Sequence, residues 1–67
     1  MKYTAKHKHG PIEYSSESAQ VVLRDMQRDK TSMFLYQFSI DGNQVLESVF
    51  IQSAQDEYNE AYREQNN

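Results

Sequence analysis

The chain has 67 residues, a net charge of −3 and no cysteine, and 37% of its residues are hydrophobic. This length allows one domain, residues 1–67, and the missing cysteines exclude a disulfide framework and a thiolate zinc site. Ordering a chain of this size costs about 100 kcal/mol, so nearly every apolar residue is needed in the core or between copies, which makes a homodimer plausible.

The apolar segments and the distribution of charge bear on cellular location and on interaction surfaces. The chain has no apolar leader and no apolar run approaching about 18 residues, so we expect a cytoplasmic protein without membrane contact. Residues 1–30 contain six lysines and arginines against four acids, a net +2, whereas residues 31–67 contain one arginine against six acids, a net −5. Such an asymmetry can mark an interaction surface or head-to-tail association.

Residues 2–8 alternate with a period of two, which predicts a strand. Tyr3, Ala5 and His7 fall on one side, and lysines dominate the other, as is typical of an edge strand. The pair Gly10-Pro11 then predicts a turn, after which a short second piece can follow.

A helix is predicted over residues 16–29. Ser15 and Ser16 are candidates for its N-cap, and Glu17 suits the first turn because a carboxylate is favourable at the positive end of the helix dipole. The apolar stripe follows i, i+3, i+4, i+7 spacing and consists of Ala19, Val22, Leu23 and Met26.

Residues 33–40 and 44–51 predict a β-hairpin around Asp41-Gly42, a pair that tolerates positive φ. A two-residue loop pairs Phe38 with Val45, and a four-residue loop pairs Ile40 with Val45. In both registers one face carries Phe34, Tyr36, Phe38, Val45, Val49 and Ile51. The other carries Met33, Leu35, Leu46 and Phe50, which is too apolar to be wholly solvated.

A last helix is predicted over residues 54–64, where Ser53 and Asp56 form a capping-box pattern. Its apolar stripe is Ala54, Tyr58, Ala61 and Tyr62. The order is thus β-α-β-β-α, an α+β domain with an antiparallel sheet of about three strands and two helices.

Protein binding is the favoured function, as in small regulators, adaptors and inhibitors of accessory or phage-encoded type. The surplus apolar sheet face needs a cover, and acidic residues beside tyrosines on the last helix suit a basic groove. The predicted surface consists of Leu35, Leu46, Phe50, Glu57, Glu60, Glu64, Tyr58 and Tyr62. We expect the partner to be another protein.

Two other functions stay open. A nucleic-acid-binding regulator would use Lys2, Lys6, Lys8, Arg24 and Arg28, although a pI near 5.2 argues against strong binding. A structural homodimer would instead bury the Leu35 and Phe50 face.

Catalysis, a cofactor and a metal are not expected. No nucleophile stands beside a base, and two glycines, Gly10 and Gly42, cannot make a phosphate loop. His7 and His9 share a strand face, but two imidazoles are too few for stable zinc, and Lys6 and Lys8 place positive charge beside them.

Overall fold

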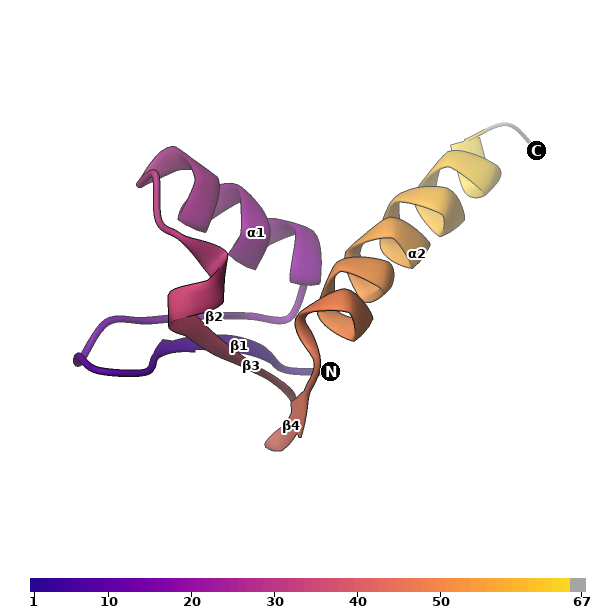
Figure 1. The fold of residues 1–67 in the computed structure, drawn as a ribbon. Coiled ribbons are helices and arrows are strands. Elements are labelled where there is room, and N and C mark those ends of the chain that lie inside the picture. Colours follow the sequence, from indigo (N-terminus) through magenta and orange to yellow (C-terminus); the bar gives the residue numbers. More distant parts are fainter. Residues whose placement is uncertain (66–67) are drawn as a thin grey trace.

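The computed structural model describes residues 1–65, and the described side chains end at Arg63. The strands and helices are β1 (Tyr3–His7), β2 (Glu13–Ser16), α1 (Ala19–Arg28), the 3₁₀ turn η1 (Met33–Leu35), β3 (Tyr36–Ile40), β4 (Asn43–Val45) and α2 (Glu47–Gln65). The sheet is antiparallel in the order β2-β1-β3-β4. The α+β class is therefore confirmed, with one strand more than expected. Figure 1 shows α1 over one face of the sheet, while α2 starts beyond β4 and projects away.

Strand β1 lies in the middle of the sheet and not at its edge, so the edge-strand prediction was wrong. Tyr3 stands opposite Ser16 of β2 on one side and opposite Ile40 of β3 on the other. The predicted alternation is nevertheless present, because Tyr3 and Ala5 are buried while Lys6 is exposed. The extra strand β2 exists because residues 13–16 pair back onto β1.

Helix α1 is shorter than the predicted range 16–29. Its N-cap is Ser18, whose Oγ accepts a hydrogen bond from the Val21 backbone N–H at 3.4 Å, because Ser15 and Ser16 belong to β2. At its end, Lys30 adopts a φ of 57° in the manner of a Schellman cap. The predicted stripe is confirmed, with Ala19, Val22 and Met26 buried and Leu23 packed against them.

The Asp41-Gly42 turn is the part of the hairpin that the sequence predicted correctly. Asp41 and Gly42 have φ of 53° and 85°, and Phe38 stands opposite Val45, which is the two-residue loop. The predicted second strand, 44–51, is wrong beyond Val45. Its apolar residues also fit helical spacing, and they continue as the start of α2.

Helix α2 begins seven residues before its predicted start at residue 54. Ser53 is therefore no N-cap: its Oγ donates to the Val49 carbonyl within the helix, at 3.1 Å. Phe50 is fully buried, and its ring lies 4.8 Å from that of Phe38 and 5.8 Å from that of Tyr3. The core comprises Tyr3, Ala5, Ala19, Val22, Met26, Tyr36, Phe38, Phe50 and Ala54.

The second face of the sheet is polar, which overturns the expectation of a second apolar face. Met33 and Leu35 belong to η1, and Leu46 and Phe50 lie beyond β4, so none of the four stands in the sheet. Opposed residues share a face, and the rows on this side contain Thr4, Lys6, Glu13, Ser15, Gln37, Ser39 and Gln44. This face needs no apolar cover.

Candidate functional site

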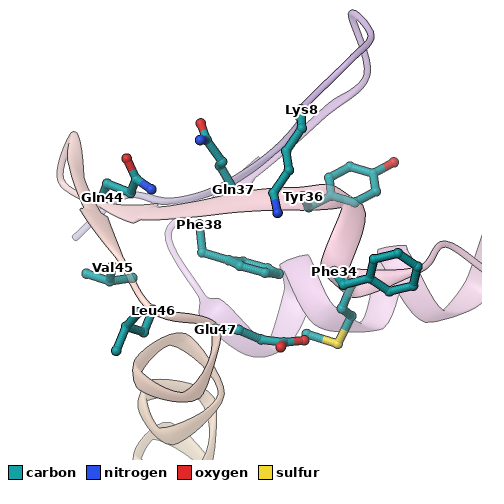
Figure 2. Close-up of a pocket in the computed structure, with 10 residues that line it drawn as sticks. Lys8, Phe34, Tyr36, Gln37, Phe38, Gln44, Val45, Leu46 and Glu47 are labelled. Carbon is teal, nitrogen blue, oxygen red and sulfur yellow. The ribbon is translucent and has the colours of Figure 1, made fainter.

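One exposed apolar surface is a hollow of about 300 Å³ beside β3, which we call the Phe34 patch (Figure 2). Its apolar lining is Met33, Phe34, Tyr36, Phe38, Val45 and Leu46, and its polar rim is Lys8, Gln37, Gln44 and Glu47. Phe34 and Leu46 are 71% and 73% exposed. Figure 2 shows Phe38 on one side of the strand, with Gln37 and Gln44 pointing to the opposite side.

The hollow exists because strand β4 is too short to cover β3. β4 ends at Val45, opposite Phe38, so Tyr36 and Gln37 have no β4 residue across from them. Phe34 belongs to the 3₁₀ turn before β3 and not to the strand. Its side chain therefore does not follow the alternation that buries Tyr36 and Phe38, and it is exposed. The Lys8 backbone N–H donates to the Leu35 carbonyl at 2.9 Å and so ties the first hairpin to η1.

Only one of the three apolar residues predicted for protein binding reaches this surface. Leu46 lines it, Leu35 is partly buried against the core, and Phe50 is a core residue that no partner or second copy can contact. Phe34, which the sequence assigned to the core face, is the residue that was missed. A 3₁₀ turn leaves no periodic signal over three residues, so its exposure had no signature in the sequence.

The acidic residues of α2 do not share one environment. The Glu57 carboxylate accepts hydrogen bonds from the Ser18 Oγ at 2.7 Å and from the Ala19 backbone N–H at 2.6 Å. It therefore caps the positive N-terminal end of α1, so the expectation that Glu57 is free for a partner was wrong. Glu60 is exposed, and the side chain of Glu64 lies outside the described residues.

The tyrosines predicted for binding lie on the projecting part of α2. Tyr58 and Tyr62 are 57% and 59% exposed, and their rings stack with centroids 6.4 Å apart and an interplanar angle of 15°. They lie about three and four helical turns beyond Glu47, the α2 residue that lines the Phe34 patch, so the predicted single surface of leucines, acids and tyrosines does not form.

The basic residues of the nucleic-acid hypothesis are also separated. Lys6 lies on the open polar face of the sheet, whereas α1 covers the opposite face and bears Arg24 and Arg28. Both arginines are engaged locally: Arg24 lies 3.4 Å from the Asp25 carboxylate, and Arg28 lies 3.3 Å from that of Asp29. Lys2 and Lys8 are exposed, but the five residues do not make one continuous basic surface.

The histidine pair is organised by a backbone contact. The His9 backbone N–H donates to Nδ1 of His7 at 3.0 Å, and the His7 ring meets Tyr36 edge-on with centroids 5.1 Å apart. That bond occupies one of the two imidazole nitrogens of His7. Within residues 1–65, no group of three or more potential metal-binding side chains comes together.

One titrating contact anchors the far end of α1. The Tyr14 hydroxyl donates to the Asp29 carboxylate at 2.7 Å, and this bond is the main reason that the pKa of Tyr14 is raised to about 12. The same bond, followed by that from Arg28, lowers the pKa of Asp29. β2 is thereby fastened to the C-terminal end of α1.

Comparison with family models, curated proteins and solved structures gave no match for this chain. Among the helices described, none combines the length and the apolar character needed to cross a membrane.

Proposed function

We propose that the chain is a small non-enzymatic protein-binding module, a regulator, adaptor or inhibitor, that docks a segment of a partner protein on the Phe34 patch. The observation that carries this proposal is the pair Phe34 and Leu46, two large apolar side chains more than 70% exposed on either side of a hollow. Exposed aromatic anchors around a preformed hollow are typical of binding hot spots. The expected cytoplasmic location stays a prediction.

The rim of the patch defines the chemistry of the segment. Lys8 and Glu47 carry opposite charges within one rim, and Gln37 and Gln44 add neutral hydrogen-bonding groups. A complementary segment has an apolar anchor for the hollow, an acid where it meets Lys8 and a base where it meets Glu47. Because the edge of β3 is open beside Tyr36, the segment is expected to be extended, lying along this edge.

Selection from a displayed random peptide library tests the proposal. The native chain and a Phe34→Ser/Leu46→Ser variant serve as separate targets, and both substituted side chains are exposed, so folding is preserved. We expect peptides with an apolar anchor flanked by an acid and a base to be enriched on the native chain and lost on the variant. Val49→Ser, which removes an exposed side chain outside the patch, is the matched control.

Equal enrichment on both targets would overturn the placement of the site. So would a consensus that lacks apolar residues. Backbone NMR shifts on adding a selected peptide give an independent reading, because perturbations should centre on residues 34–38 and 44–47.

A further inference from the structure

Helix α2 carries a second surface, separate from the Phe34 patch. Ile51, Gln55, Tyr58 and Tyr62 follow i, i+4, i+7, i+11 spacing and form one stripe along a flank of the helix, which we call the uncharged stripe. All four are exposed, Ile51 to 44% and the tyrosines to more than half.

Charge is segregated away from the stripe between Ile51 and Tyr62, and Glu47, one turn before Ile51, marks its N-terminal end. Between Ser48 and Tyr62, all within the described helix, the acids are Asp56, Glu57 and Glu60. Glu57 points to α1, where it caps the helix, and the other two share the spacing of Val49 on the opposite flank. In a chain of which 25% is charged, the stripe and its neighbours Ser48, Gln52 and Asn59 form a neutral surface.

The stripe leads into an apolar groove between the two helices. The groove has a volume of about 280 Å³ and is lined by Leu23, Met26, Gln27, Thr31, Met33 and Ile51. None of these lining residues is charged, so the neutral surface continues from α2 across to α1.

We propose that the occupant is a second copy of this chain, with the two α2 helices packed antiparallel. The two-fold axis is perpendicular to the helices and crosses each of them at the level between Asp56 and Glu57. In that register Ile51 stands opposite the partner's Tyr62, and Gln55 stands opposite the partner's Tyr58. The stripe is thus complementary to itself, and the partner's Tyr62 is carried over the apolar groove that Ile51 borders.

Charge is the reason that a copy fits better than an unrelated protein. In a two-fold contact the same surface of both copies forms the interface. A surface of one charge sign would therefore face like charges, whereas a neutral surface is not repelled. The acids Asp56 and Glu60 remain on the outer flank in such a pair. Pairing also supports the distal part of α2, since an isolated helix of a few turns is marginal in water.

The available area indicates a weak dimer. A fully covered aromatic side chain buries about 150–250 Å², so four tyrosines that are 57% and 59% exposed supply about 350–600 Å². Leu23 and Met33 are already partly buried, so the rest of the roughly 1,200 Å² that marks the lower end of specific interfaces must come from Ile51 together with the exposed polar residues Gln55, Ser48, Gln52 and Asn59 of both copies. Association should therefore depend on concentration.

Analytical ultracentrifugation of the native chain from about 10 µM to about 1 mM tests the dimer. Ile51 and Val49 are both 44% exposed on opposite flanks, so Ile51→Glu and Val49→Glu form a matched pair. We expect the native chain and Val49→Glu to associate and Ile51→Glu to stay monomeric. Tyr58→Glu should also be monomeric, and far-UV circular dichroism verifies that each variant is folded.

Disulfide trapping tests the register. A Gln55→Cys chain mixed with a Tyr58→Cys chain should form the mixed cross-link faster than either chain cross-links to itself. A native chain that is monomeric at every concentration overturns the proposal, as does an Ile51→Glu dimer or preferred self-cross-linking of Gln55→Cys. Phe34→Ser should leave association unchanged, which separates this surface from the peptide-binding patch.

Discussion

The two halves of helix α2 lie in different surroundings. The first half, residues 47–57, buries Phe50 and Ala54 and ties itself to α1 through Glu57. The second half, residues 58–65, contributes Tyr58, Ala61 and Tyr62, all exposed. Figure 1 shows this half extending past the end of α1. The amphipathic spacing runs unbroken through both halves, so periodicity alone does not say where tertiary contact ends.

The boundary between the halves is set by the N-terminus of α1. Glu57 accepts hydrogen bonds from the N-cap Ser18 and from the Ala19 backbone N–H in the first turn of that helix. One turn earlier, the Gln20 side-chain N–H donates to the Ala54 carbonyl at 3.1 Å. Beyond this point Tyr58, Ala61 and Tyr62 are exposed.

The largest expected effect comes from Phe50→Ala in the packed half. Truncating a fully buried phenylalanine costs about 3–5 kcal/mol, which approaches the whole stability of a domain this small. Urea denaturation followed by circular dichroism measures the loss of unfolding free energy. Phe50→Leu should lose less stability, and it replaces Phe50→Ala in the test if that variant does not fold. Val49→Ala, at the exposed neighbouring position, should change the unfolding free energy by less than about 0.5 kcal/mol. A similar loss for both would contradict the packing described.

Glu57→Ala should follow, with a loss of about 1.5–3 kcal/mol. The substitution removes two charge-assisted hydrogen bonds and leaves the Ala19 N–H without its acceptor at the positive end of α1. Glu57→Gln keeps one acceptor oxygen and should lose less. The matched control is Glu60→Ala one turn further on, an exposed acid in the distal half, and a loss there equal to that of Glu57→Ala would remove the distinction between the halves.

Ala61→Gly probes the distal half itself. Glycine in the interior of an exposed helix costs about 1 kcal/mol of local helix stability, and Ala61 is an exposed position. We expect faster amide hydrogen exchange confined to residues 58–65, with the global unfolding free energy nearly unchanged. A drop in global stability as large as that of Glu57→Ala would show that the distal half belongs to the cooperative core.

The smallest effect on stability is expected at the opposite end of α1, where it is visible by spectroscopy. Asp29→Asn removes the carboxylate that raises the pKa of Tyr14 to about 12, so the Tyr14 pKa should fall toward its ordinary value near 10. An alkaline titration of tyrosinate absorbance measures the change, with Tyr14→Phe identifying the transition. No shift after Asp29→Asn would rule out the bond.

The sign of the pH dependence follows from the two shifts. The pKa of Tyr14 is raised, so its contribution to stability is complete below about pH 10 and is lost as pH rises toward about 12. The pKa of Asp29 is lowered, so its contribution is present above about pH 4 and is lost as pH falls. The variant Asp29→Asn should lack both changes.

Local chemistry predicted several elements correctly. Asp41-Gly42 specifies a tight hairpin turn because few other pairs accept two positive φ angles in succession. The stripe of α1 also appears as expected, since four apolar residues at helical spacing in ten residues have one consistent interpretation.

Residues 46–51 show where local pattern fails. Leu46 and Phe50 are four residues apart. Residues at this spacing lie on the same face of a strand and also on the same face of a helix, so the run fits either structure. Burial of Phe50 between Tyr3 and Phe38 resolves this ambiguity, and both contacts come from strands far away in the sequence. The error placed Phe50 on a predicted binding surface, whereas it is a core residue.

The amino-acid sequence therefore carries the α+β class, the tight turn, the buried faces of β1 and α1 and the segregation of charge, because each depends on neighbours a few residues apart. Only the tertiary structure decides that Glu57 caps a helix 38 residues away, that Phe34 stands exposed and that the open face of the sheet is polar. Those features depend on where distant segments meet, and no local period encodes that meeting.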